Sequence, residues 1–262
     1  MMAWGYIPGL EHGFKNFLLR LIGHPHPNGR TRARKVLQLL ERGKTLDIGC
    51  GEGIFYYELG RRGIKLNGID YSLEALRNMR EKLQAAHVEL PVCNANAQKL
   101  PFKKRSFDQI ICLDVLEHLP DAQAALKEMS RVLRKHGVII ITVPNELYLT
   151  KPVLPINFKE HLKVIGHETA GFGYQQLKAM LEKEGFRIVR HEYYLKFFGR
   201  IMTELTFWLI GGRRMLRARK QMYKYSYLAF LAFTLTYPVM FLDELLPNRD
   251  GGMLAVKAVK VK

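Results

Sequence analysis

The chain has 262 residues, 48% of them hydrophobic, and a formal net charge of +17 at pH 7. This composition excludes a disordered chain and suffices for one α/β domain with an appended element. Three cysteines without C-x-x-C spacing or metal-type neighbours predict a reduced, cytoplasmic protein with no disulfide scaffold and no metal site. The N-terminal ten residues lack the features of a signal peptide. The charge indicates a nucleic acid or an anionic membrane surface as partner.

Short apolar runs alternate with helical patterns along most of the chain. Strands are predicted at residues 45–48, 66–69, 88–93, 109–113, 138–143, 187–194 and 253–261. Helices are predicted at residues 54–62, 73–86, 122–133 and 174–184, after a loop over 23–29 and a helical pattern over 30–42. We therefore predict an α/β fold with a doubly wound, seven-stranded, mostly parallel sheet. Ligands of such sheets lie beyond the C-terminal strand ends.

A glycine-rich turn, D-I-G-C-G-E-G at residues 47–53, follows the first predicted strand. Glycines allow positive φ and a close approach of a ligand to the backbone. A dinucleotide site requires a further glycine where this chain has Ile54, so the pattern disfavours a pyrophosphate ligand and a dehydrogenase. The acidic Asp47 beside the turn favours a ligand with a cationic end.

Four further segments follow in order. The second predicted strand ends at Asp70 and Tyr71, and Ser72 is available to cap the next helix. The others are N-A-N-A-Q-K-L-P-F at 94–102, S-F-D-Q-I-I-C-L-D-V-L-E-H at 106–118 and L-R-K-H-G-V at 133–138. Together, the five segments resemble the class I S-adenosylmethionine-dependent methyltransferases, of the small-molecule and lipid type found in ubiquinone biosynthesis.

The resemblance implies a Rossmann-like fold and S-adenosylmethionine as cofactor. Asp70 stands where relatives bind both ribose hydroxyls, and Asn96 stands where they use an aspartate for the adenine amino group. Asp114 is expected to shape the pocket for the methionine end. The cofactor-binding residues expected from the resemblance are Asp47, Gly49, Cys50, Gly51, Gly53, Asp70, Tyr71, Asn96, Ala97, Asp114 and Val115.

Three histidines are candidates for the acceptor side. Methyl transfer is an in-line displacement, so the enzyme mainly positions the acceptor and excludes water. An oxygen acceptor also benefits from a general base, for which His118 is the first candidate because it follows the fourth predicted strand. His161 and His167 lie where relatives often carry a G-H segment at the acceptor site. Alternatively, His118 only bonds the backbone, and the other two are solvated loop residues.

Residues 195–250 interrupt the strand–helix alternation and read as a basic, aromatic, helical insertion. Residues 225–242 form an uncharged stretch about long enough to span a bilayer, directly after a basic cluster. A single crossing conflicts with the return of the last strand to the sheet, so helices lying in the membrane interface are expected instead. The alternative is a soluble hydrophobic cap over the acceptor pocket or a dimer contact.

We predict four segments: a lead-in (1–44), the cofactor-binding core (45–194), the insertion (195–250) and the last strand (251–262). The predicted function is methylation of a hydrophobic acceptor, a quinone-like or polyprenyl lipid, by a cytoplasmic protein peripheral to the inner membrane face. One alternative is an RNA methyltransferase, disfavoured because D-V-L-E at 114–117 lacks the prolines typical of base-amine methylation. The other is a catalytically idle methyltransferase fold that serves as a membrane scaffold.

Overall fold

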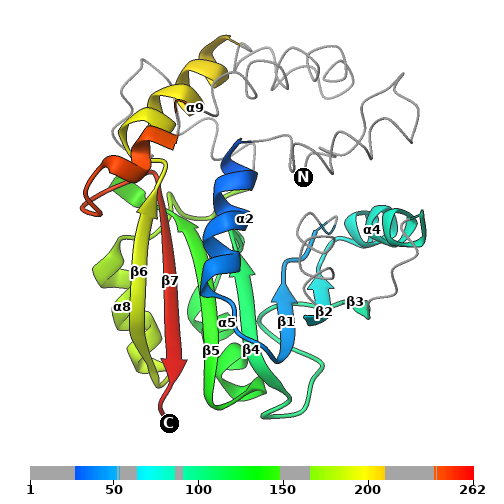
Figure 1. The fold of residues 1–262 in the computed structure, drawn as a ribbon. Coiled ribbons are helices and arrows are strands. Elements are labelled where there is room, and N and C mark those ends of the chain that lie inside the picture. Colours follow the sequence, from blue (N-terminus) through cyan, green and yellow to red (C-terminus); the bar gives the residue numbers. More distant parts are fainter. Residues whose placement is uncertain are drawn as a thin grey trace.

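A seven-stranded sheet forms the centre of the molecule, in the order β3-β2-β1-β4-β5-β7-β6 (Figure 1). The structure is a computed structural model that describes residues 27–51, 53, 64–85, 91–147, 166–209, 239 and 241–262. The strands are β1 (Lys44–Ile48), β2 (Lys65–Asp70), β3 (Val92–Asn94), β4 (Phe107–Leu113), β5 (Leu133–Pro144), β6 (Phe186–Tyr194) and β7 (Met253–Lys260). Strand β7 pairs antiparallel with β5 and β6, and the other pairs are parallel. The predicted mostly parallel, seven-stranded sheet is confirmed.

The described helices are α2 (Pro27–Leu39), α4 (Leu73–Ala85), α5 (Ala122–Val132), α8 (Tyr174–Lys183) and α9 (Phe197–Leu209), with 3-10 turns η1 (Leu116–His118) and η2 (Phe241–Leu245). The helices predicted at 73–86, 122–133 and 174–184 are confirmed almost to their ends. Helix α2 differs from the helical pattern predicted over 30–42, because it begins at Pro27, inside the predicted loop, and ends at Leu39. Proline suits a first helical turn, where its missing N–H is not needed. The helix predicted at 54–62 lies outside the described residues.

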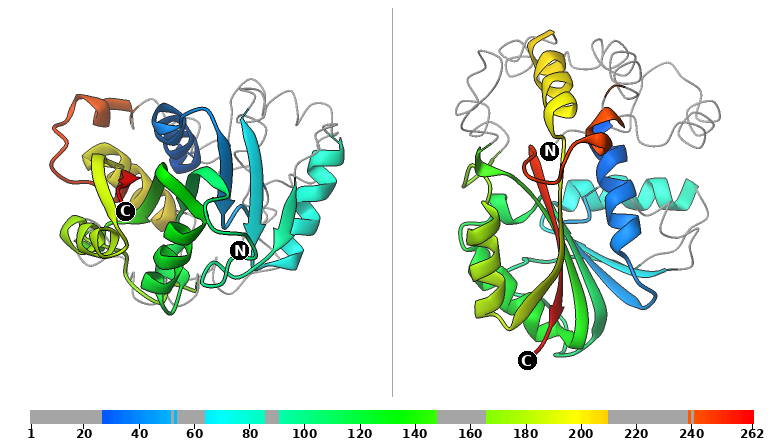
Figure 2. Two further views of the ribbon diagram at one scale, coloured as in Figure 1. Left: turned by 90° about the horizontal axis from the view of Figure 1, so that it is seen from below. Right: turned by 60° about the vertical axis from the view of Figure 1, so that its left-hand side comes forward.

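Both faces of the sheet are covered, as the views in Figure 2 show. Along β4, Ile110 and Cys112 face the core shared with α5 and α8, whereas Ile111 and Leu113 face the core shared with α2 and α4. This alternation follows from the two-residue period of a strand. It makes the central strands apolar on both sides, which is typical of a doubly wound sheet.

The segment between β6 and β7 leaves and rejoins the sheet at one edge, because β7 runs antiparallel to β6 (Figure 1). At this edge β1, β4 and β5 end. The Asp243 carboxylate of η2 accepts hydrogen bonds from the N–H groups of Phe198 (2.8 Å) and Gly199 (3.0 Å), so η2 caps the start of α9. Both described parts of the predicted insertion are therefore helical and joined to each other.

Two expectations for the insertion extend beyond what the structure describes. Most of the uncharged stretch 225–242 lies outside the described residues. Within the described residues, no helix has the length and apolar character needed to cross a membrane. The four predicted segment boundaries stay predictions.

Candidate active site

The glycine loop after β1 lies against the end of β2. The N–H groups of Gly49 and Cys50 both donate to the carbonyl of Ile69, at 2.8 and 2.9 Å. Gly49, Gly51 and Gly53 have φ values of 73°, 54° and 73°, which favour glycine. A Cβ on Gly49 would lie 2.3 Å from Cγ2 of Val115, so the loop and the residues after β4 are in close contact.

Asp70, at the end of β2, connects the glycine loop to α4. Its buried carboxylate accepts hydrogen bonds from the N–H groups of Gly51 and Ser72, both at 2.8 Å. The Ser72 hydroxyl accepts from the N–H of Ala75 and caps α4, so Asp70 is not needed as the helix cap. A carboxylate has about four acceptor positions, which leaves room for two ribose hydroxyls.

The open side of Gly51 is the best place for a ligand in this loop. A Cβ built on Gly51 would have no atom of the described residues within 4 Å. Asp47, nearby at the end of β1, is only 4% exposed, and no described residue donates a hydrogen bond to its carboxylate. Burial raises the pKa of Asp47 to about 8, with a further increase from the charge of Asp70 and a decrease from Arg32. A buried carboxylate without a donor fits the cationic amino-acid end of S-adenosylmethionine.

The remaining cofactor candidates differ in what they can offer. Tyr71 is 81% exposed, so its ring is free to stack on a planar ligand. The Asn96 amide oxygen accepts from the N–H of Gln98 at 2.8 Å and keeps one further acceptor position. The side chain of Ala97 packs in the core, and Cys50 places its sulfur 3.9 Å from Sδ of Met79. Both side chains point inward, and only their backbone groups can face a ligand.

Asp114 follows β4 with a positive φ of 55°, which is uncommon for residues other than glycine, although aspartate adopts it more readily than most. The Thr142 hydroxyl donates to its Oδ1 at 2.6 Å, and Arg32 of α2 forms an ion pair with its Oδ2. The lead-in helix therefore contributes a charged group to the site. Sequence reasoning missed Arg32, because nothing in the pattern of α2 connects it with a residue 82 positions later.

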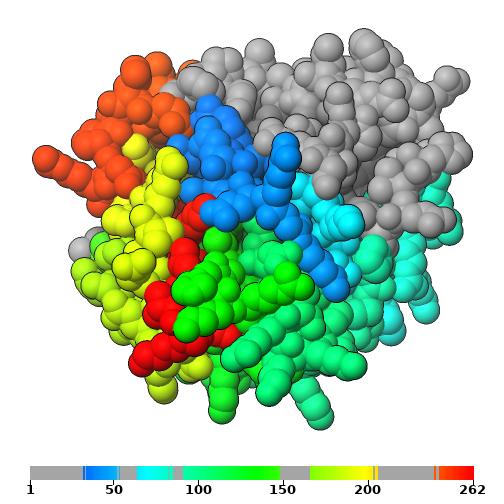
Figure 3. Space-filling view, turned by 60° about the horizontal axis from the view of Figure 1, so that its bottom comes forward, coloured from blue at the N-terminus to red at the C-terminus, as the bar shows by residue number. Residues whose placement is uncertain are grey.

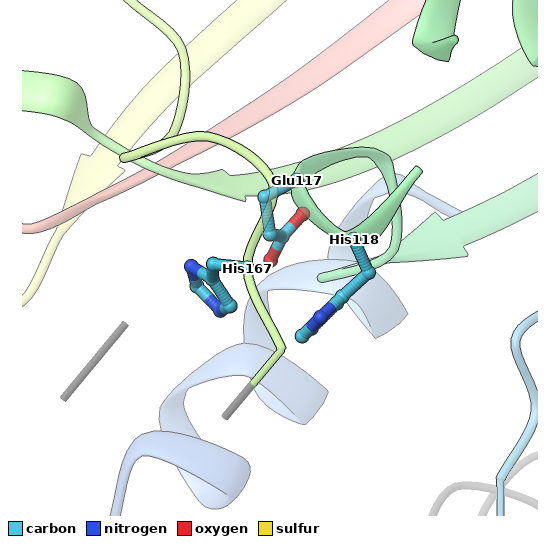
Figure 4. A group of neighbouring side chains, drawn as sticks. All are labelled: Glu117, His118 and His167. Atoms are coloured by element: carbon cyan, nitrogen blue, oxygen red, sulfur yellow. The ribbon is translucent and has the colours of Figure 1, made fainter. Parts of the chain in front are cut away.

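The acceptor-side histidines lie at the same edge of the sheet. His118 Nδ1 lies 2.9 Å from the carbonyl oxygen of Gly166, and the rings of His118 and His167 meet edge to face at 4.5 Å. Figure 4 shows both rings beside the carboxylate of Glu117. The His118–Gly166 contact shows the backbone bond considered for His118, and it leaves Nε2 for other partners. His161 lies outside the described residues.

Glu117 is a second functional candidate that sequence reasoning did not single out. Its side chain is fully buried, and neither carboxylate oxygen has a hydrogen-bond partner among the described residues. Burial, together with the charge of Asp114, raises its pKa well above the ordinary value. The signal was present in the D-V-L-E-H segment, but a sequence does not show that this glutamate points inward.

The fold and this site define a class I methyltransferase, and comparisons with known proteins agree. Residues 46–141 match a family described as "Methyltransferase domain". The demethylmenaquinone methyltransferase of Staphylococcus aureus is 32% identical over 186 residues, covering 63% of this chain and 76% of that protein.

Solved structures share the fold at low identity. The [4+2]-cyclase SpnF aligns with a TM-score of 0.60 and 19% identity, over 88% of this chain and 81% of that one. Phosphoethanolamine N-methyltransferase 2 from Haemonchus contortus, in complex with S-adenosylhomocysteine, aligns with a TM-score of 0.65 and 18% identity, over 100% of this chain and 61% of that one.

The chain belongs to the class I S-adenosylmethionine-dependent methyltransferases. It is an enzyme of this family, with S-adenosylmethionine as its cofactor. The residues around the glycine loop fit this cofactor.

Proposed function

We propose that this enzyme methylates a hydrophobic, quinol-like acceptor at a membrane surface. The observation that carries the proposal is a group of exposed apolar side chains in the insertion, at the sheet edge where the cofactor candidates lie (Figure 1). These are Phe197 (56% exposed), Val239 (37%), Leu242 (42%) and Leu245 (82%). An apolar acceptor needs such a surface on its path from a bilayer to the site. The similarity to a demethylmenaquinone methyltransferase supports the same acceptor class.

The chemistry assigned to the site divides between its two sides. When bound, S-adenosylmethionine supplies a methyl group on a positively charged sulfur. On the cofactor side, we assign Asp47 to the cationic end and Asp70 to the ribose. On the acceptor side, His118 is fixed by Gly166, which favours a proton on Nδ1 and a free Nε2. That nitrogen can accept the proton that an acceptor hydroxyl or activated ring carbon loses on methylation.

Peripheral attachment to the inner face of the cytoplasmic membrane accounts for both the high positive charge and the exposed apolar side chains. The net charge of +17 attracts anionic headgroups, and each basic residue near such a surface contributes about 1 kcal/mol. The exposed apolar residues of α9 and η2 insert at the acyl boundary. The ion pairs of Arg34 and Lys35 with Glu244 tie η2 to α2, and Figure 3 shows the two lying side by side.

Liposome flotation tests the membrane part of the proposal. A Phe197→Ser/Leu245→Ser variant should bind phosphatidylglycerol vesicles several-fold more weakly than the wild type, because it removes two exposed apolar anchors. Leu73→Ser is the matched control, since Leu73 is 58% exposed on α4, outside the insertion, and its loss should leave binding unchanged. Equal binding by all three proteins, or no binding by the wild type, would contradict membrane attachment.

The acceptor is tested with methyl-labelled S-adenosylmethionine. Purified enzyme in detergent should label a reduced, prenylated naphthoquinone or benzoquinone, and His118→Ala should lower kcat with little change in cofactor affinity. Label found in RNA but in no quinol would replace the proposal with a nucleic-acid methyltransferase.

A further inference from the structure

Glu117, His118 and His167 form a compact group that the methyl-transfer chemistry above does not fully use. One potential ligand atom from each of the three lies within 4.8 Å of the others. Glu117 and His118 come from η1, whereas His167 comes from the segment before α8 (Figure 4). The N–H groups of Glu168 (2.8 Å) and Thr169 (3.3 Å) donate to the carbonyl of Glu117, which holds the two segments together.

The Glu117 carboxylate is the unusual member of this group. A buried carboxyl group without hydrogen bonds is destabilising, and more so when it is charged and unpaired. No described residue supplies a hydrogen bond to either of its oxygens. Arg32, the nearby cation, forms an ion pair with Asp114, and its charge also acts on Glu117. Within the described part of the chain, Glu117 is therefore a buried carboxyl group beside two imidazole rings and without a hydrogen-bond partner.

The geometry fits metal coordination with a small adjustment. Ligand atoms that lie about 2.0–2.2 Å from one tetrahedral ion are about 3.3–3.6 Å from each other. The observed spacing of at most 4.8 Å requires only small side-chain rotations. The bond between His118 Nδ1 and the Gly166 carbonyl is the kind of outer contact that orients a ligating imidazole and leaves Nε2 for the ion.

We propose that Glu117, His118 and His167 bind one divalent cation. Two imidazoles and one carboxylate suit a first-row ion such as Mn²⁺, Fe²⁺ or Zn²⁺ better than Ca²⁺, which prefers a shell of oxygens. The sequence did not predict this site, because His167 is 49 positions after His118 and only the fold brings them together.

The site gives the cation a role that rests on the proposed function. Three protein ligands leave coordination positions open. An acceptor hydroxyl bound there has a lowered pKa and loses its proton to water, as with other metal-bound oxygens. Its oxygen then forms the bond to the methyl carbon as the carbon–sulfur bond breaks, and a neutral thioether leaves. A cation on His118 Nε2 excludes proton acceptance by that nitrogen, so metal and imidazole are alternative means of activating the acceptor.

Metal binding is tested first, independently of any acceptor. Mn²⁺ is titrated into the tag-free full chain, with the free ion followed by electron paramagnetic resonance and Zn²⁺ used as competitor. The wild type should bind one Mn²⁺ per chain, and Zn²⁺ should displace it. Glu117→Gln and His167→Ala should each weaken binding at least by the roughly 10–100-fold typical for loss of a supporting residue. His136→Asn, at an exposed position of β5, is the matched control and should bind as the wild type does.

Two further measurements keep the result interpretable. All variants must melt cooperatively and bind S-adenosylmethionine, which separates a lost ligand from a misfolded chain. No Mn²⁺ or Zn²⁺ binding by the wild type, or undiminished binding by Glu117→Gln and His167→Ala, would overturn the proposal. Metal binding without quinol methylation would refute the proposed function alone. Methylation by a wild type that binds no metal would refute this inference alone and leave His118 as the base.

Discussion

Gly49 and Gly51 both have positive φ, but an added methyl group would meet different surroundings at each. At Gly49 the Cβ would lie 2.3 Å from Cγ2 of Val115, whereas at Gly51 no described atom lies within 4 Å. Left-handed φ costs a non-glycine residue about 1–2 kcal/mol. Overpacking adds about 1–3 kcal/mol. We therefore expect Gly49→Ala to lower the free energy of unfolding by about 2–5 kcal/mol and Gly51→Ala by only about 1–2 kcal/mol.

For cofactor affinity the larger effect is expected from Gly51→Ala, because the cofactor is expected to lie over the open side of Gly51. Gly51→Ala then fills ligand space in a protein that is still stable, and its affinity for S-adenosylmethionine should fall by at least about tenfold. Urea unfolding without cofactor measures the first effect, and calorimetric titration of folded protein measures the second. The double variant Gly49→Ala/Val115→Ala should recover the overpacking part of the loss, because it removes the clashing methyl group.

Two outcomes would refute this reasoning. Equal destabilisation by Gly49→Ala and Gly51→Ala would show that contact with Val115 does not limit residue 49. Wild-type cofactor affinity in Gly51→Ala would show that the cofactor does not occupy the space beside Gly51.

Three further variants test the electrostatics and the local packing. Because the pKa of Asp47 is raised, the folded protein binds its proton more tightly than the unfolded chain does, so the free energy of unfolding should fall as pH rises from about 4 to about 8. Asp47→Asn should remove this pH dependence, stabilise the cofactor-free protein at pH 8 by about 1–3 kcal/mol and weaken cofactor binding. An unchanged pH dependence in urea unfolding of the variant would contradict this. Arg32→Met should destabilise by about 1–3 kcal/mol, less than for a fully buried pair because both side chains are partly exposed, and Arg32→Met/Asp114→Asn should recover much of the loss. Ser72→Ala should cost about 1 kcal/mol through loss of the α4 cap and leave cofactor affinity nearly unchanged.

The fold could be predicted from local patterns because its central strands are apolar and its helices amphipathic. Strands β1, β2, β4, β6 and β7 were predicted nearly to their ends. The start of β5 was missed, because His136 takes a positive φ of 63° in a stretch that reads as a surface turn. The start of α2 was missed because Pro27 and Gly29 indicate a loop, although proline is well accommodated in a first turn.

The placement of the candidate site residues was predictable where they lie in one short segment and not where the fold brings distant segments together. Asp47 and Asp70 lie at the C-terminal ends of β1 and β2, the three glycines follow β1, and the structure brings them to one edge of the sheet. Arg32 reaches Asp114, and His167 reaches His118, only through tertiary packing. The inward direction of Glu117 depends on the 3-10 turn after β4, which no local pattern indicated.

Calorimetric titration with S-adenosylmethionine, alongside NADH and the Asp70→Asn variant, tests the central claim most directly. Asparagine retains the size of Asp70 but loses the charge that would accept both ribose hydroxyls, at about 1.5–3 kcal/mol per bond. We predict micromolar binding of S-adenosylmethionine by the wild type, no binding of NADH, and an affinity roughly 10–150-fold lower in the variant. Wild-type affinity in a folded Asp70→Asn protein, or no binding by the folded wild type, would contradict this account of the site.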